Sequence, residues 1–234
     1  GRVSKSAVRG ILARVYMYMS GYPLRENHYE DVVYWAKQVV EDPAHGLNPS
    51  YSNIFIKIAR DEYDIKECIW EMEAWGNGTY ELSKTTKNGQ GNGPGCTNEI
   101  TGRSDGSLTV SSKLFNAYEN NDLRKFWCIP FFTYNATGAN GAKTLATTQL
   151  ANYSAAAKWG FKTAKYRREY ETLMPKLFGQ TGQNVPLLRD SDGLLMYAEA
   201  LNELGGPENG DAIEAINKVR RRAYDIGGIK ALTI

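Results

Sequence analysis

The stretch RDSDGLLMYAEALNELGGPENGDAIEAINKVRRRA, which runs from Arg189 to Ala223, decides the fold. Leucine and alanine recur in its first half at the spacing of one helix face, and isoleucine and valine do so in its second half. Gly205-Gly206-Pro207 ends the first helix. Two short helices joined so closely pack antiparallel, so the sequence predicts a pair of helices over residues 190–204 and 209–223.

A second pair of helices is predicted near the start of the chain, over residues 4–19 and 29–41. Ser4 can cap the first of them, and Asp42-Pro43 breaks the second. Small residues that face larger apolar ones in both pairs are typical of tetratricopeptide-like packing, although the strict consensus is absent. The predicted fold class is therefore mainly α, with tetratricopeptide-like helical hairpins and long irregular loop insertions.

The middle of the chain has a different pattern of residues from the two predicted helix pairs. Residues 65–75 alternate apolar and charged side chains and fit an edge strand or a helix end; we favour extended structure. Residues 76–109 and 135–158 are rich in loop-forming residues. The glycine-rich run at 89–95 lacks the Lys-Ser or Lys-Thr of a phosphate-binding loop, so a flexible loop is expected there.

Two further segments of the middle region carry local signals. Ser111 or Ser112 is expected to cap a short helix that runs through Tyr118. The cations of residues 165–168 stand next to Glu169 and Glu171, which predicts a solvated charged face.

Composition excludes several classes of function. The 234 residues are 42% hydrophobic and 23% charged with a formal net charge of +2, as in an ordinary globular protein without nucleic-acid partners. No apolar stretch is long enough to span a bilayer, and Gly1-Arg2 does not open a signal peptide. Cys68, Cys96 and Cys128 are scattered and odd in number, and His28 and His45 have no metal-ligand spacing, so no metal and no cofactor are expected.

Four motifs, in order along the chain, resemble the SusD/RagB family. They are GRVSKSA at residues 1–7 with LARVY at 12–16, NDLRK at 121–125, the Asn-x-Pro approach at 184–192, and the final hairpin. Gly193 departs from the family pattern and should cost about 1 kcal/mol of helix propensity relative to alanine. The match begins inside the family pattern, so the chain is expected to be a fragment that lacks the amino-terminal part. We expect one domain over residues 1–234, with a hairpin at 1–45, a loop-rich insertion at 46–183 and a hairpin at 184–224.

The resemblance implies a function and partners. Family members are non-catalytic, cell-surface lipoproteins of the outer membrane that bind an oligosaccharide or polysaccharide and deliver it to a SusC-like TonB-dependent transporter. The membrane would then be reached through an upstream lipid anchor that this chain does not contain. The remaining hypotheses are a helical-repeat scaffold that binds a peptide inside the cell, and a glycoside hydrolase that uses two central carboxylates such as Glu71 and Glu73. An upstream export signal with a lipid-attachment cysteine would favour the first reading over the peptide scaffold.

Candidate ligand-binding residues lie in the segment WGNGTY at residues 75–80. Sugars present apolar C–H faces and many hydroxyls, so aromatic rings and amides on a loop suit them. In SusD-like proteins aromatics from this part of the chain contribute to the ligand site, which implies Trp75 first, with Tyr80 assisting and Asn77 supplying hydrogen bonds. The alternative is that Trp75 anchors the loop in the core. Weaker candidates are Trp127, which is expected in the core, and the two aromatics Tyr134 and Trp159.

Overall fold

The computed structural model describes residues 3–148 and 150–224 and divides into two compact units. Unit 1 comprises residues 1–50, 64–71 and 186–234, and unit 2 comprises residues 51–63 and 72–185. Gly1 and Arg2, which open the first family motif, lie outside the described residues.

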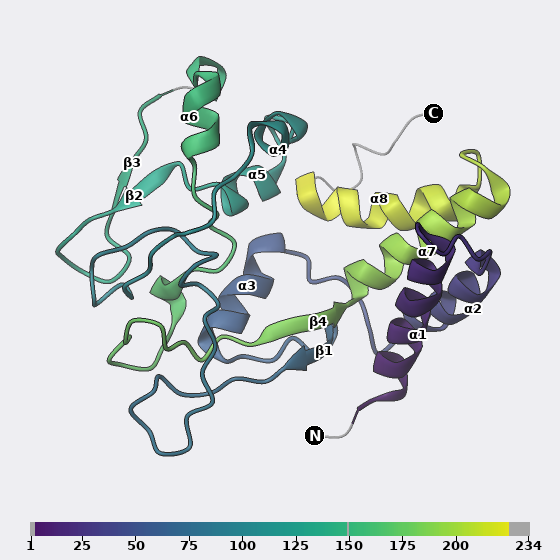
Figure 1. Ribbon diagram of the computed structural model, residues 1–234, viewed down its shortest axis with the longest axis horizontal. Helices are drawn as coiled ribbons and strands as arrows, with labels where there is room; N and C mark the ends of the chain where they lie inside the picture. The colour runs from purple at the N-terminus through teal and green to yellow at the C-terminus, as the bar shows by residue number, and fades with distance from the viewer. Residues whose placement is uncertain (1–2, 149, 225–234) are drawn as a thin grey trace. The chain divides into compact units, whose positions relative to one another are not determined.

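Unit 1 contains the helices predicted at both ends of the chain, each within one residue of the expected bounds (Figure 1). A two-stranded sheet, β1 with β4, completes it. Its elements are α1 (Lys5–Ser20), α2 (Tyr29–Val40), β1 (Cys68–Met72), β4 (Val185–Arg189), α7 (Asp190–Gly205) and α8 (Gly210–Tyr224). The extended structure favoured for residues 65–75 is confirmed over Cys68–Met72, which form β1, whereas residues 65–67 form a turn. The side chain of Ser4 caps α1 by accepting from Ala7 N at 3.1 Å. No helix in the described part of the chain is long and apolar enough to cross a membrane.

The helices of unit 1 pack as two hairpins that share one core. α1 packs on α2 and α7 packs on α8, while α2 also lies against α7, so the hairpins stack as tetratricopeptide-like repeats do. Their shared core contains small residues such as Ala13, Ala36 and Ala200, all fully buried, between larger apolar ones. This arrangement confirms the predicted fold class.

Two helical glycines of unit 1 lie at contacts between elements, and they differ in how closely the neighbouring element approaches. Gly193 lies in α7, and a Cβ built on it would stand 3.4 Å from Val40 and 3.5 Å from Val39 of α2. Gly10 of α1 is tighter still, since a Cβ there would stand 2.3 Å from the fully buried side chain of Leu188 in β4. Close approach of β4 therefore explains Gly10, whereas a Cβ at Gly193 would make ordinary van der Waals contacts with α2.

A buried ion pair joins α8 to the segment before β1. Glu67 is fully buried, and its carboxylate accepts from Arg222 Nη1 at 2.6 and 2.5 Å. The same carboxylate accepts from the backbone N–H of Asn48 at 2.6 Å, and Arg189 Nη1 stands 3.5 Å away. Arg222 belongs to the triple-arginine run, so this cation contributes a specific buried contact in addition to complementing the helix dipole.

Replacing Glu67 by glutamine should destabilise the protein by about 3–5 kcal/mol, because Arg222 would remain buried without its counter-charge. The measurement is chemical denaturation of the whole chain. The matched control is Glu214→Gln, which removes the exposed partner of Arg221 on the same helix and should cost no more than about 1 kcal/mol. Equal losses for the two variants would contradict the structural importance of the buried pair.

Unit 2 consists mainly of loops, tied together by short elements. They are α3 (Tyr51–Arg60), α4 (Ser112–Ala117), α5 (Leu123–Cys128), β2 (Phe132–Tyr134), β3 (Lys143–Leu145), η1 (Leu150–Asn152), α6 (Ala155–Gly160) and η2 (Arg168–Tyr170). Ser111 caps α4 by accepting from Leu114 N at 3.1 Å, which decides between the two predicted caps. β2 and β3 pair antiparallel with Thr133 opposite Thr144.

The prediction of a solvated charged face at residues 165–168 is wrong. Arg167 and Arg168 are 7% and 2% exposed. The Arg167 guanidinium lies 3.8 Å from the ring centre of Trp127 and donates to the Trp127 carbonyl at 2.9 Å. Arg168 pairs with Glu171 at 3.0 Å and donates to loop carbonyls. The contacts of Arg167 with Trp127 and of Arg168 with Arg103 join segments far apart in the sequence, so the local charge pattern does not reveal this burial.

Candidate functional site

The segment that carries the predicted ligand-binding residues is a closed loop in unit 2. Trp75 N donates to the Lys84 carbonyl at 2.9 Å, and Lys84 N donates back to the Trp75 carbonyl at 2.9 Å. Ala74 N donates to Asn184 Oδ1 at 2.7 Å just before the loop begins. The backbone at Trp75 is thus fixed on both sides, and residues 76–83 form the turn between the two bridge residues.

Two glycines shape this turn. Gly76 and Gly78 both have φ of +86°, a conformation that L side chains rarely adopt. A Cβ at Gly76 would also meet Ser83 Oγ at 2.4 Å, and one at Gly78 would meet the Gln180 side chain at 2.9 Å. The glycines therefore let the loop fold tightly, with Trp75 at its start and Tyr80 within the turn.

Trp75 and Tyr80 form an exposed aromatic pair. Their side chains are 43% and 45% exposed, and their ring centroids lie 5.4 Å apart at an interplanar angle of 46°. The structure therefore brings these two predicted residues together and places both at the surface. The alternative, in which Trp75 anchors the loop in the core, does not fit this exposure.

Asn77 takes a different place from the one expected. It is 3% exposed, its Nδ2 donates to the Pro175 carbonyl at 2.8 Å, and its Oδ1 accepts from the Thr79 N–H at 3.2 Å and from Thr79 Oγ1 at 2.6 Å. Its amide therefore holds the loop closed, a local arrangement that asparagine commonly makes in turns. This burial corrects the expectation that Asn77 offers hydrogen bonds to a ligand.

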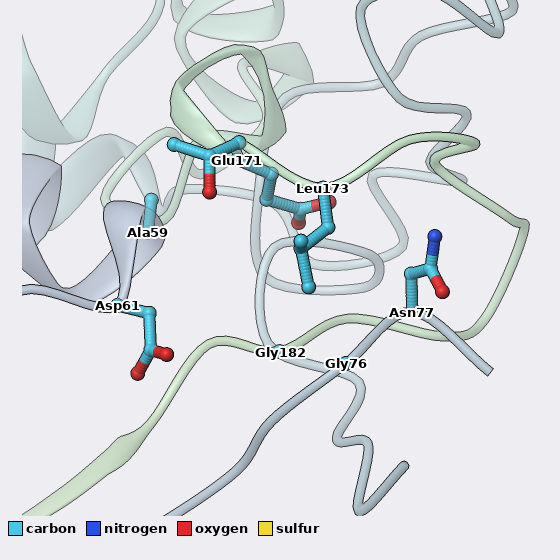
Figure 2. Close-up of a pocket in the computed structure, with 8 residues that line it drawn as sticks. Ala59, Asp61, Gly76, Asn77, Glu171, Leu173 and Gly182 are labelled. Carbon is cyan, nitrogen blue, oxygen red and sulfur yellow. The ribbon is translucent and has the colours of Figure 1, made fainter. Parts of the chain in front are cut away.

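The space behind the loop is too small for a ligand. A hollow of about 20 Å³ is lined by residues that include Gly76, Asn77, Glu171 and Leu173, and this volume suits about one water molecule. Figure 2 shows the Glu171 and Leu173 side chains lying over the point where the chain passes through Gly76 and Gly182. Any ligand of the Trp75–Tyr80 pair must therefore bind on the outer faces of the rings.

The central carboxylates are engaged within the protein. Glu73 accepts a hydrogen bond from the Tyr63 hydroxyl, and Glu67 is the buried partner of Arg222. Burial, and then the nearby charge of Glu73, raise the pKa of Asp61, whose side chain lines the small hollow behind the loop. Glu171 accepts from Arg168 and from Gln183 Nε2 at 2.9 Å. These contacts give Glu67, Glu73 and Glu171 structural roles.

The other candidate aromatics occupy different surroundings. Trp127 is 8% exposed and donates from Nε1 to the Lys165 carbonyl at 3.0 Å, so the expectation of a core residue is confirmed. Burial raises the pKa of Tyr134, whose ring lies against Phe132. Trp159 is 56% exposed on α6.

Cysteine and histidine offer no metal site in the part of the chain that the structure describes, since no group of three or more His, Cys, Asp or Glu is placed to hold an ion. Cys68, Cys96 and Cys128 are free thiols. Burial, followed by the charge of Glu71, raises the pKa of Cys68 to about 12.

A larger hollow, which the sequence did not indicate, lies elsewhere in unit 2. It has a volume of about 570 Å³ and is bordered by the β2–β3 hairpin and the end of α6. It is lined by Pro130, Phe132 and Thr133, by residues 144–148, and by Tyr153, Gly160, Phe161 and Lys162. No single motif holds these residues, so no local signal could have revealed the groove.

A comparison with known protein families shows which family the chain belongs to. The model of the SusD family matches residues 66–227, which is more than half of the chain. The chain belongs to the SusD family. This membership confirms the resemblance that the four sequence motifs indicated. No match to the chain is found among curated proteins.

Solved structures agree with this assignment to the SusD family. A SusD homolog from Bacteroides thetaiotaomicron is 26% identical, with a TM-score of 0.83, and the alignment covers 100% of this chain and 47% of that one. A SusD superfamily protein from Parabacteroides distasonis is 21% identical, with a TM-score of 0.69 and coverage of 100% and 47%. Surface glycan-binding protein A from Bacteroides thetaiotaomicron, solved in complex with laminarihexaose, is 19% identical, with a TM-score of 0.68 and coverage of 99% and 50%. The chain spans about half the length of these SusD-family structures.

Replacing Asn77 by alanine should loosen the loop that carries Trp75 and Tyr80. The variant loses the hydrogen bonds that the buried Asn77 amide makes to the Pro175 carbonyl and to Thr79, which together should cost about 1–3 kcal/mol. Limited proteolysis within residues 76–83 should become faster, and thermal unfolding should shift downward. Glu81→Ala, at an exposed position in the same loop, is the control and should change neither. An unchanged cleavage rate in Asn77→Ala would contradict the role assigned to this amide.

Proposed function

We propose that this chain, acting as one domain over residues 1–234, belongs to a non-catalytic protein that binds glycans through the Trp75–Tyr80 pair. The observation that carries the proposal is the exposure of two adjacent rings on a loop whose backbone is fixed by the Trp75–Lys84 bridge. A rigid aromatic surface binds the apolar C–H face of a sugar ring with little loss of conformational entropy. Two adjacent exposed rings can stack on the sugars of an oligosaccharide or polysaccharide.

The family supports the cellular part of the proposal. We propose that the whole protein sits on the outer face of the outer membrane and delivers captured glycan to a SusC-like TonB-dependent transporter. One structural relative is a surface glycan-binding protein solved with laminarihexaose, which makes a glucan the first ligand to test. An export signal and a lipid-attachment cysteine upstream in the gene would favour this proposal over an intracellular scaffold that binds a peptide.

Glycoside hydrolysis is less well supported by the site. That chemistry needs one carboxyl group that can donate a proton and a second carboxylate on the other side of the scissile bond. Of the central carboxylates, Glu67 is fully buried against Arg222 and Glu73 is hydrogen-bonded to Tyr63, so these two are occupied by protein partners. A binding role makes no such demand on them.

Trp75→Ala should weaken glycan binding at this loop by about tenfold or more, as loss of a central aromatic contact does in other interfaces. Its thermal midpoint should stay nearly unchanged because the ring is already 43% exposed. Isothermal titration calorimetry with laminarihexaose and other oligosaccharides gives the affinity, and thermal unfolding gives the stability.

Tyr18→Ala is the matched control for this substitution, since Tyr18 is a 73% exposed aromatic on α1. It should bind as the unchanged protein does. A Trp75→Ala variant that keeps its affinity and loses about 3–5 kcal/mol of stability would show that Trp75 supports the core, and the site assignment would then be wrong.

Incubation of the chain with polysaccharides should release no reducing ends. A reducing-sugar assay over hours is the measurement, with Glu71→Gln and Glu73→Gln as the diagnostic variants. Release that disappears in either variant would establish hydrolysis and overturn the non-catalytic part of the proposal.

A further inference from the structure

The groove beside the β2–β3 hairpin has the size of a ligand site. Its volume of about 570 Å³ falls within the range of roughly 300–1,000 Å³ that small-molecule sites occupy. The hollow behind the Trp75 loop, at about 20 Å³, does not. Figure 1 shows β2, β3 and α6, the elements that border the groove, near one another within unit 2.

Aromatic rings line the groove and are held from behind by a small core. Phe161 stacks on Phe115 with centroids 5.6 Å apart and an interplanar angle of 20°, and Tyr153 meets Phe161 edge-on at 4.9 Å. Phe115 is 2% exposed and forms this core with Val110 and Ile129. Phe161 and Tyr153 are only partly buried and line the groove. Their rings are therefore fixed before any ligand arrives, which lowers the entropic cost of binding.

Hydroxyl groups surround these rings. Thr133, Thr147 and Thr148 line the groove and are exposed. Among the described residues, none of these three hydroxyls nor that of Tyr153 has a side-chain hydrogen-bond partner. Each threonine hydroxyl can both donate and accept, which matches the hydroxyls of a sugar.

The free edge of β3 adds backbone groups to the same border. Ala146 N donates to the Phe131 carbonyl at 2.8 Å, and Asn135 N donates to the Ala142 carbonyl at 2.9 Å. Hydrogen-bonded and non-hydrogen-bonded residue pairs alternate along an antiparallel ladder. Leu145 is next to the hydrogen-bonded Ala146, so the N–H and C=O of Leu145 point away from β2. β2 is the only sheet neighbour of β3 in the described residues. Leu145 lines the groove, and its backbone N–H and C=O are not used by the β2–β3 ladder.

Charge narrows the class of ligand. Lys162 is the only ionised side chain among the described residues that line the groove. A polycation would find no counter-charge there, whereas a neutral or acidic sugar would find ring faces, hydroxyls and one ammonium group. Aromatic faces bordered by uncharged hydrogen-bonding groups are the chemistry of carbohydrate recognition.

We propose that this groove is a second carbohydrate-binding site, separate from the Trp75–Tyr80 pair. The two sets of residues share no member. The proposal goes beyond the function proposed for the loop, because the groove can bind a sugar whether or not the loop does. Two sites on one chain would also raise the avidity for a long polysaccharide that reaches both.

Gly160 offers a way to close the groove without disturbing the fold. It lines the groove at the end of α6, and a Cβ built on it meets no atom within 4 Å. Gly160→Trp should therefore project a large ring into the groove. Gly46→Trp is the matched control, since a Cβ at Gly46 also meets nothing within 4 Å and this residue lines neither site.

The experiment titrates the whole chain and its variants with laminarihexaose, maltohexaose, xylohexaose and hexagalacturonate. Trp75→Ala should still bind at least one of these probes. Adding Gly160→Trp to that variant should weaken the remaining binding by about tenfold or more, and adding Gly46→Trp should change it by less than about twofold. Circular dichroism and thermal unfolding confirm that all variants fold.

The outcomes separate the two proposals. If Trp75→Ala abolishes all binding, or if Gly160→Trp acts no differently from Gly46→Trp, the groove is not a carbohydrate site. If Trp75→Ala changes nothing and Gly160→Trp alone removes binding, the groove is supported and the loop site is wrong. If none of the probes binds the unchanged chain, both proposals are overturned.

Discussion

Backbone N–H and C=O groups can be buried only if they form hydrogen bonds, and this requirement shapes unit 2, which consists mainly of loops. Long polar side chains supply the partners that helices and sheets would otherwise provide. The guanidinium of Arg168 donates to the carbonyls of Arg103, Leu177 and Gln180. Because guanidinium carries several N–H donors in one rigid plane, a single buried arginine joins segments that lie far apart in the sequence. The buried charge of Arg168 also needs a counter-charge, and Glu171 supplies it through an ion pair at 3.0 Å.

The exposed rings depend on this polar interior. Asn77 ties the Trp75 loop to the Pro175 carbonyl, and Thr86 forms a backbone bridge with Thr181 beyond the loop. The segment between Pro175 and Thr181 is in turn held by the donation of Arg168 to Leu177 and Gln180. The buried side chain of Arg168 thus supports the segment to which the loop of Trp75 and Tyr80 is tied. A binding surface built on irregular backbone acquires rigidity in this way, and rigidity is what limits the entropic cost of stacking.

Sequence reasoning succeeded where the signal was local and failed where it was not. The apolar spacing and breakers of α1, α2, α7 and α8 lie within each helix, so their bounds were predictable to one residue. Trp75 and Tyr80 were predictable as surface candidates because glycines flank them, but the buried amide of Asn77 depends on Pro175, almost one hundred positions away. The burial of Arg167 depends in the same way on Trp127. The helix α3 (Tyr51–Arg60) was not predicted, although the helical spacing of its buried apolar residues is present in the sequence.

The two proposed sites differ in the kind of recognition that they can support. The Trp75–Tyr80 pair offers ring faces, while the amide of Asn77 in the same loop is engaged by Pro175 and Thr79. Stacking of this kind contributes affinity with little preference among sugars, because most pyranose rings present an apolar face. The groove adds hydroxyls and a strand edge around its rings, and a site that hydrogen-bonds a particular hydroxyl rejects ligands that lack it. On these proposals, affinity for a polysaccharide would depend mainly on the loop, and discrimination among sugars would depend mainly on the groove.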